Sequence, residues 1–358
     1  MSPAVPIARR TNSLSSSLGL GEKLFASSDE RRFAAAIEQG LETVEAGLLG
    51  QMTYADEIAD ATSRYLLDAG GKRVRPVLTL LAAQLGDGNT PKVITAAQAV
   101  EITHLASLYH DDVMDEAQMR RGVPSAQTVW GNSVAILTGD LLFARASKLV
   151  ATLGERAITL QSNTFEKLCL GQLHETIGPR HGEDPVAHYL QVLADKTGSL
   201  IATAAEVGVI FSNASEDYVI PVRTFGEKIG VAFQLIDDII DLSDKTEVTG
   251  KTAGTDLRAG VSTLPLLYLR ELAKVDSDAD DLLRRIERDV TTAFHGEADE
   301  ADLDAAIAEL RDHAVTARTL EEAHRWAREA VEALAPLPDG PVKKALTRFA
   351  DSIVERSN

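Results

Sequence analysis

Two short segments of this chain each carry three aspartates that one helix face would bring together. They read Asp111-Asp112-Val113-Met114-Asp115 and Asp237-Asp238-Ile239-Ile240-Asp241. With about 3.6 residues per turn, positions i, i+1 and i+4 lie on the same side of a helix. Carboxylates this close repel one another unless a cation lies between them. Carboxylates that leave room for water ligands suit Mg²⁺ better than Ca²⁺, and no nearby Cys/His set indicates zinc, so the spacing predicts magnesium binding.

Basic residues stand at two places where they could hold an anion. Lys72 and Arg75 follow Gly70-Gly71 directly before a predicted helix over residues 77–85. Glycines permit a tight turn, and a helix N-terminus attracts anions. Arg120 and Arg121 come just after the first aspartate segment, where guanidinium groups can bind a phosphate through paired hydrogen bonds. Beside a metal, these groups indicate a diphosphate site, although either basic pair alone is typical of ordinary surface charge.

Helices are the elements that must position these residues. From Asp29 onward apolar residues recur at helical spacing, as in Phe33, Ile37 and Leu41, and strand-type alternation is absent. Residues 1–27 are rich in Ser, Pro and Gly, which predicts a disordered N-terminal tail. We expect a single all-α domain over residues 28–358, since large single-core folds of this length occur.

The overall charge and composition argue against several kinds of partner. The formal net charge is −18, whereas binding to a nucleic-acid backbone needs a basic surface. No apolar run reaches the roughly 20 residues of a membrane-spanning helix, and no signal-peptide core is present near the start. We therefore expect a cytoplasmic protein with at most peripheral membrane contact. The single cysteine, Cys169, lies in an apolar stretch, which predicts a buried free thiol.

In these features the chain resembles the trans-prenyl diphosphate synthase (polyprenyl synthetase) family from about Gly70 to Pro265. Besides the two aspartate motifs, further matches keep the family's order: Gly70 to Arg75, His104, Arg120-Arg121-Gly122, Gly139-Asp140, Gly171-Gln172, Lys196-Thr197, Phe233-Gln234 and Gly250-Lys251. The resemblance implies an isoprenoid-synthase-type helical bundle around a central cavity, with both motifs near its mouth. It also implies a homodimer that condenses isopentenyl diphosphate with an allylic diphosphate and depends on Mg²⁺.

The resemblance assigns roles to individual residues. Direct Mg²⁺ ligands are expected at Asp111, Asp115 and Asp237. Ligation through water, or support of the ligands, is expected from Asp112, Asp238 and Asp241. The leaving diphosphate would be stabilised by Arg120, Lys196 and Lys251. The pocket for isopentenyl diphosphate would be formed by Lys72, Arg75, His104 and Arg121. Thr197 and Gln234 would present oxygen dipoles to the allylic cation, and the departing diphosphate would remove the final proton.

Two positions depart from the family pattern. Many relatives carry a Lys after the Gly that precedes Thr-Leu-Pro, whereas Val261 stands here, so one phosphate contact is expected to be missing. Three residues beyond Gln172 the family often has Asp, and this chain has Glu175, which keeps the charge on a longer arm. Neither departure removes a predicted metal ligand.

Small residues before the first motif bear on product length. Family members that make short products usually have an aromatic residue five positions before the first Asp of the motif, or at the neighbouring position. This chain has Ala106 and Ser107 there. Phe143 is a candidate for the residue that closes the far end of the tunnel for the growing chain, although an aromatic residue at such a position is more often an ordinary core residue. Because small residues leave the tunnel open, each helical turn lengthens it by about 5.4 Å. This predicts an all-trans product of roughly six to ten isoprene units, with a quinone side chain as its destination. A four-unit, geranylgeranyl product is the alternative, and Ala106→Phe should shorten the product.

Two rival hypotheses concern the type of protein. A terpene cyclase shares one Asp-rich helix, but usually pairs it with an Asn/Ser/Glu metal motif. A non-catalytic subunit of a heteromeric synthase typically lacks intact Asp motifs. The six aspartates of this chain disfavour both hypotheses.

Overall fold

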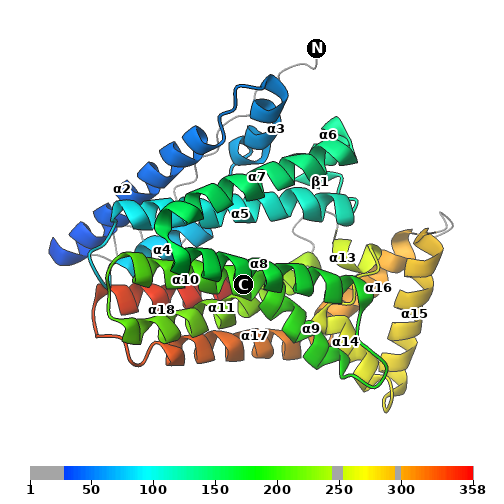
Figure 1. Cartoon of the computed structure of the whole chain (residues 1–358). Coiled ribbons are helices and arrows are strands. Elements are labelled where there is room, and N and C mark those ends of the chain that lie inside the picture. The colour runs from blue at the N-terminus through cyan, green and yellow to red at the C-terminus, as the bar shows by residue number, and fades with distance from the viewer. Residues whose placement is uncertain (1–27, 244–252, 295–299, 358) are drawn as a thin grey trace. The chain divides into compact units, whose positions relative to one another are not determined.

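A computed structural model describes residues 28–243, 253–294 and 300–357 (Figure 1). The tail predicted for residues 1–27 and the candidate Lys251 lie outside these ranges. The all-α prediction is confirmed, because the described chain is helical apart from loops and two strands of two residues each. None of the helices in these ranges combines the length and apolar character that crossing a membrane would need.

The helices fall into two compact units. Unit 1 comprises the described residues up to Glu166, Leu200–Gly226 and Ala333–Phe349. Unit 2 comprises Lys167–Ser199, Glu227–Glu332 and the described residues from Ala350. Helices α8 (Glu155–Ile177), α11 (Val219–Asp241) and α18 (Pro341–Val354) contribute residues to both units. The assignment of residues 28–358 to one domain stays a prediction.

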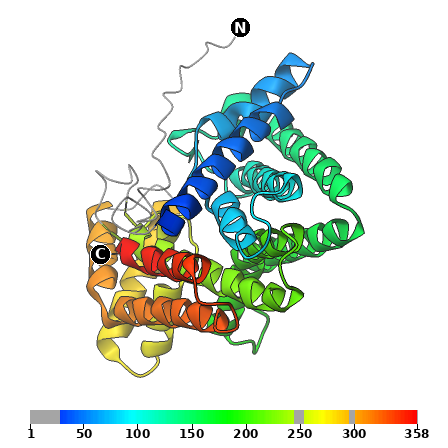
Figure 2. The same ribbon diagram turned by 90° about the vertical axis from the view of Figure 1, so that its left-hand side faces the viewer.

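Unit 1 is built around α5 (Pro91–Met114), which Figure 2 shows nearly end-on. Its neighbours are α2 (Ser28–Gln51), α4 (Val74–Ala83), α6 (Ala126–Trp130) and α7 (Asn132–Leu153). The sequence starts α5 in the expected way: the Thr90 side chain accepts a hydrogen bond from the Val93 N–H, and Pro91 occupies the first turn. Further elements of this unit are α3 (Glu57–Asp68), β1 (Met119–Arg120), β2 (Val123–Pro124), α10 (Ser199–Phe211) and the 3₁₀ turn η2 (Glu216–Tyr218).

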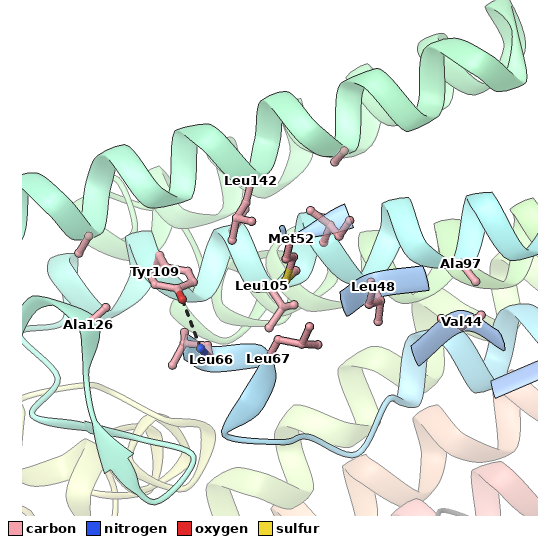
Figure 3. Packing of buried hydrophobic residues seen from close by; sticks show 14 residues of the cluster. Val44, Leu48, Met52, Leu66, Leu67, Ala97, Leu105, Tyr109, Ala126 and Leu142 are labelled. Atoms are coloured by element: carbon pink, nitrogen blue, oxygen red, sulfur yellow. Dashed lines mark hydrogen bonds between the residues drawn. The ribbon is translucent and has the colours of Figure 1, made fainter. Parts of the chain in front are cut away.

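A buried hydrophobic cluster joins α2, α3, α5 and α7 (Figure 3). Leu48, Leu105 and Leu142 are among its fully buried members. Tyr109 of α5 is fully buried too, and its hydroxyl accepts a hydrogen bond from the Leu66 N–H at 3.3 Å and donates one to the Thr62 carbonyl. This pairing satisfies the phenol inside the core and ties the last turns of α3 to α5.

Unit 2 positions the second aspartate motif. Its elements are α9 (Pro185–Leu193), the π-helical turn η1 (Ala194–Gly198), α13 (Thr255–Arg258), α14 (Leu264–Leu272), α15 (Ser277–Phe294), α16 (Glu300–Asp312), α17 (Ala314–Ala333) and the 3₁₀ turn η3 (Glu355–Ser357). Helix α14 packs on α9 and α15, and α15 packs on α16. The π-helical turn η1 continues α9 without a break, and it carries Lys196 and Thr197, which agrees with the frequent location of π-bulges at functional sites.

The prediction that Cys169 is buried is wrong. The thiol is exposed on α8. Its apolar neighbours Leu170 and Leu173 are exposed as well, at 42% and 50%. An apolar stretch predicted a buried helix face, but in the chain by itself this face of α8 lies on the surface.

Candidate active site

The three aspartates of the first motif have three different environments at the end of α5. Asp111 is half-buried, Asp112 is buried and Asp115 is exposed at the C-cap position. The Arg120 guanidinium donates from Nε to Asp112 Oδ1 at 2.6 Å. Burial raises the pKa of the Asp112 carboxyl, and the charge of Arg120 opposes that rise. Asp112 is therefore buried in an ion pair, whereas Asp111 and Asp115 are more accessible.

A small hairpin positions the two arginines that follow this motif. Strands β1 and β2 pair antiparallel, and the turn between them consists of Arg121 and Gly122 with φ of 53° and 77°. Two positive φ values match the tight turns that suit the twist of a hairpin. Arg121 Nη1 donates to the Leu66 carbonyl at 2.7 Å and also to the Gly70 carbonyl. The hairpin thus holds Arg121 against the loop that precedes α4. The sequence did not predict it, because two-residue strands are too short to show alternation.

The glycine loop before α4 is anchored by a residue that the sequence did not single out. Gly70 and Gly71 adopt φ of 95° and 147°, as expected for a turn that requires glycine. Arg73 is 6% exposed, and it donates from Nε to Glu45 at 2.5 Å and from Nη1 to Glu101 at 3.3 Å. This arginine serves the loop's structure. The loop presents exposed Lys72, and the first turn of α4 that follows it carries half-buried Arg75.

Four positive side chains surround His104 on α5. Burial lowers the pKa of His104 well below its usual value, and the charges of Arg75, Arg121, Arg120 and Arg73 lower it further. The imidazole is therefore neutral. Burial also lowers the pKa of Arg75 to about 10, so it stays cationic at neutral pH, and its buried Nε has no hydrogen-bond partner. Crowded cations with an unsatisfied donor favour an anionic ligand, and the Asp111 charge also acts on Arg75.

The second motif, at the end of α11 in unit 2, has a different set of partners. Asp237 is half-buried and lies 3.1 Å from Arg356 Nη2, whose guanidinium stacks 4.8 Å over the Phe233 ring. Asp238 is 6% exposed, and Tyr189 donates its hydroxyl to Asp238 Oδ2 at 2.7 Å. Burial raises the pKa of Asp238 to about 8, although the hydrogen bonds from Tyr189 and from the Leu264 N–H oppose the rise.

The start of α13 supports the last aspartate of this motif. Asp241 Oδ2 accepts a hydrogen bond from the Asp256 N–H at 3.1 Å, and the Asp241 carbonyl accepts one from the Gly254 N–H at 2.7 Å. The Asp256 carboxylate contributes to the raised pKa of Asp238. The sequence did not identify Asp256, Tyr189 or Arg356 as part of this site.

Lys196 and Glu175 form an ion pair in unit 2. Lys196 Nζ lies 2.5 Å from Glu175 Oε2, so the glutamate that departs from the family pattern reaches the lysine of the site. Gly171 permits this approach of α8 to η1, because a Cβ there would lie 2.7 Å from the Lys196 backbone nitrogen. Thr197 and Gln234 are both half-buried, and Val261 is 40% exposed.

The candidate chain-length residues lie in unit 1, among core residues. Ala106 is fully buried in the hydrophobic cluster, and Ser107 is half-buried with its hydroxyl donating to the His104 carbonyl at 2.9 Å. Phe143 packs against Phe165 and His110, at ring-centroid distances of 4.4 and 5.5 Å. A phenylalanine at position 106 would have to displace core residues, so Ser107 is the better position for a blocking substitution.

The donor chemistry at each motif fits a hard cation. Within the residues that the structure describes, no three or more His, Cys, Asp or Glu side chains converge as a ready-made metal cage. Mg²⁺ does not need such a cage, since it binds one or two carboxylates and fills its shell with water and ligand oxygens. Asp111 and Asp115 could supply those carboxylates in unit 1, and Asp112 Oδ2 is a buried oxygen without a hydrogen-bond partner beside them.

Comparison with known proteins gives concordant matches. The model of a family described as polyprenyl synthetase matches residues 56–298. A nonaprenyl diphosphate synthase of Mycobacterium tuberculosis is 43% identical over 327 residues, which is 90% of this chain and 94% of that protein. The crystal structure of a decaprenyl diphosphate synthase from Rhodobacter capsulatus has a TM-score of 0.79 and 34% identity, covering 92% of this chain and 99% of that chain.

A further solved structure matches equally well. It is a geranylgeranyl pyrophosphate synthase from Corynebacterium glutamicum, complexed with calcium and isoprenyl diphosphate. Its TM-score is 0.77 at 37% identity, with 93% of this chain and 98% of that chain covered. These matches confirm the predicted isoprenoid-synthase-type helical fold.

Proposed function

Because this chain belongs to the polyprenyl synthetase family and is an enzyme that transfers prenyl groups, we propose that it lengthens an allylic diphosphate with isopentenyl diphosphate units. The observation that carries this proposal is the cluster of arginines Arg75, Arg120 and Arg121, whose charges act on a neutral His104 and which is linked to the first aspartate motif through the Arg120–Asp112 ion pair. A diphosphate matches both parts, because it offers oxygens to a metal and negative charge to the arginines.

In unit 1 the proposed roles follow from burial and charge. Arg75 and Arg121, with Lys72 on the loop, bind the diphosphate of the isopentenyl substrate, and neutral His104 offers it a hydrogen bond without adding charge. Asp111 and Asp115 hold Mg²⁺. That ion would supply charge neutralisation to the departing allylic diphosphate. Arg120 is held by Asp112 and supports the same leaving group.

In unit 2 the residues of the second motif have proposed roles of their own. Asp237 supplies a metal ligand. Asp238 and Asp241 connect α11 to α9, α14 and α13 through Tyr189, Leu264 and Asp256. Lys196 stabilises the leaving diphosphate after exchanging its Glu175 partner for it. Thr197 and Gln234 face the allylic cation with neutral oxygens, which do not trap it as a strong nucleophile would. Lys251 joins the leaving-group contacts in the same proposal.

The product is proposed to be a medium- or long-chain all-trans polyprenyl diphosphate, destined for a quinone side chain. The nonaprenyl and decaprenyl relatives support this length, and small Ala106 and Ser107 are consistent with it. The geranylgeranyl relative keeps a four-unit product as the alternative. Ser107→Phe should shorten the product without abolishing turnover, because it leaves every proposed metal ligand unchanged.

We propose that the enzyme acts as a cytoplasmic homodimer. Ile136 and Leu137 on α7 and Ile158 on α8 are 42%, 64% and 47% exposed in unit 1, and exposed apolar side chains of this kind favour association. Light scattering after size-exclusion chromatography would test the dimer. A chain that is active only after a second, different subunit is added would overturn it.

The proposed activity is tested with the purified chain, Mg²⁺, labelled isopentenyl diphosphate and an allylic starter. Chromatography of the dephosphorylated products should give a ladder that ends in the medium- or long-chain range. A ladder that ends at three or four units would refute the length, and a cyclic hydrocarbon made from the starter alone would favour a terpene cyclase instead.

A further inference from the structure

The hairpin of β1 and β2 in unit 1 carries two residues of the proposed diphosphate site, but it is too short to hold itself in place. Each strand has two residues, and isolated two-stranded hairpins are at best marginally stable in water. Arg120 ends β1, and Arg121 lies in the turn. The tertiary contacts of the hairpin therefore decide where both guanidinium groups lie.

The two arginines have separate anchors. Arg120 is paired with buried Asp112 of α5. Arg121 donates from Nη1 to the carbonyls of Leu66 and Gly70, at and just beyond the end of α3, where unpaired helix carbonyls attract cations. An incoming diphosphate would attract the same guanidinium group. The carbonyl contacts of Arg121 therefore cannot hold the hairpin once that group binds substrate.

Tyr65 of α3 gives the hairpin an anchor that uses no substrate-binding group. Its hydroxyl donates to the Pro124 carbonyl at 2.8 Å, across 59 positions of sequence. Its ring meets the Trp130 ring of α6 edge to face, with centroids 4.8 Å apart, and α3 packs on α6 (Figure 1). Pro124 pairs with Met119 across the hairpin, so Tyr65 connects strand β2 to α3.

Helix α3 is a firm support for this contact. The fully buried Tyr109 of α5 accepts a hydrogen bond from the Leu66 N–H and donates one to the Thr62 carbonyl, and these two residues flank Tyr65 along the chain. Gln127 of α6 also contacts the hairpin region, by donating to a backbone carbonyl just before β1 at 2.9 Å. That bond links the hairpin only to the element that follows it, whereas Tyr65 links the hairpin to the core of unit 1.

We propose that Tyr65 is a positioning residue for Arg121. Its hydroxyl holds strand β2 on α3 while the Arg121 guanidinium exchanges the carbonyls at the end of α3 for the diphosphate of the isopentenyl substrate. The proposal rests on the proposed function, because it concerns binding of the same substrate. Tyr65 acts through the hairpin and does not touch the reacting atoms.

The test compares the full-length wild type with Tyr65→Phe, which removes the hydroxyl and keeps the ring, in steady-state kinetics with Mg²⁺. The KM for isopentenyl diphosphate should rise between about twofold and tenfold, the range that corresponds to one hydrogen bond. The kcat and the KM for the allylic diphosphate should stay close to the wild-type values, because Arg120 keeps its own anchor on Asp112. Calorimetric titration with isopentenyl diphosphate alone should show the same loss of affinity.

Tyr54→Phe is the matched control. It removes the same atom from another tyrosine of unit 1, whose hydroxyl is buried and has no hydrogen-bond partner among the described residues. This variant should keep the wild-type affinity for isopentenyl diphosphate. An equal loss of affinity in Tyr54→Phe would overturn the proposal, because it would show a general effect of removing a tyrosine hydroxyl.

The outcomes separate the two proposals. If the wild-type chain lengthens no allylic diphosphate, the proposed function fails and the positioning role fails with it. If the wild type is active and Tyr65→Phe keeps its KM and affinity for isopentenyl diphosphate, only the positioning role is overturned, even if the melting temperature falls. A parallel rise of KM for both substrates would also overturn it, because that result would show a general distortion of the site.

Discussion

The ends of α5 and α11 carry the same Asp-Asp-X-X-Asp pattern but are supported in different ways. In α5 the middle carboxylate, Asp112, is paired with a cation, since Arg120 lies 2.6 Å away. In α11 the middle carboxylate, Asp238, has a neutral phenol, Tyr189, at 2.7 Å and the backbone N–H of Leu264. Burial raises the pKa of both carboxyls; the charge of Arg120 opposes the rise at Asp112, whereas neutral donors leave Asp238 with a pKa of about 8.

The first aspartate of each motif, Asp111 or Asp237, also has a different charged neighbour. Asp237 lies 3.1 Å from Arg356 near the C-terminus, whereas Asp111 lies in the electrostatic field of Arg75 in the first turn of α4. One motif therefore begins beside a cluster of several arginines, and the other beside a single arginine whose side chain is 30% exposed. A repeated motif does not imply a repeated environment, because each carboxylate takes its properties from the partners that the fold supplies.

The largest expected effect is common to both motifs. Asp111→Ala and Asp237→Ala should each lower turnover by several orders of magnitude, because each removes a proposed metal ligand. Folding should be preserved, since loss of one clustered carboxylate relieves repulsion. Turnover and thermal melting check both statements, with the exposed Asp339→Ala as control. A fully active variant at either position would show that this motif does not supply a metal ligand needed for turnover.

The next effect should separate the two motifs by stability. Arg120→Ala leaves buried Asp112 without its cation and should lower the free energy of unfolding by about 3 kcal/mol. Tyr189→Phe removes one neutral donor from Asp238 and should cost about 1 kcal/mol. Denaturant unfolding without metal measures both losses. Equal losses in the free energy of unfolding would mean that the charge of the partner does not affect stability. The double variant Arg120→Ala with Asp112→Asn should recover much of the larger loss.

A pH series sharpens the same contrast. The pKa of Asp238 is about 8 in the folded chain and near 3.8 when unfolded, so between these values the folded state holds a proton that the unfolded state has released. The free energy of unfolding contributed by this group is therefore highest below pH 4 and falls as pH rises to 8. Asp238→Asn should flatten the melting temperature of the metal-free chain between pH 5 and 8. Asp112→Asn should flatten it less, because Arg120 opposes the rise of the Asp112 pKa.

The smallest effect concerns Arg356. Its ion pair with Asp237 is partly exposed, and such pairs contribute at most about 1 kcal/mol, or roughly fivefold in an equilibrium constant. Arg356→Gln removes a competing cation, so the affinity of the chain for Mg²⁺ should rise by up to that factor in calorimetric titration. Lys344→Gln, which loses a comparable pair with Glu30, should leave the affinity unchanged. A weaker affinity in Arg356→Gln would show that the arginine supports the site.

The sequence by itself determined the helical class and the grouping of each aspartate triplet. Both depend on the period of an α-helix, which is a property of a few consecutive residues. It can be seen in the four-residue spacing of Asp111 and Asp115 and of Asp237 and Asp241. The ordered matches then indicated the family, which the comparisons confirmed. The turn at Gly70 and Gly71 was likewise predicted from neighbouring residues alone, and both glycines adopt the positive φ that only glycine takes freely.

Only the tertiary structure decided which of these residues are supports and which remain accessible. Burial and pairing depend on residues far apart in the chain: Tyr189 lies 49 positions from Asp238, and Arg73 lies 28 positions from both Glu45 and Glu101. No local period encodes such partners, so Arg73 and Arg75 looked alike in sequence, although Arg73 anchors the glycine loop and Arg75 has a buried Nε without a hydrogen-bond partner. For the same reason Cys169 looked buried. An apolar stretch shows that a helix has an apolar face, but the packing around that face decides whether it is covered.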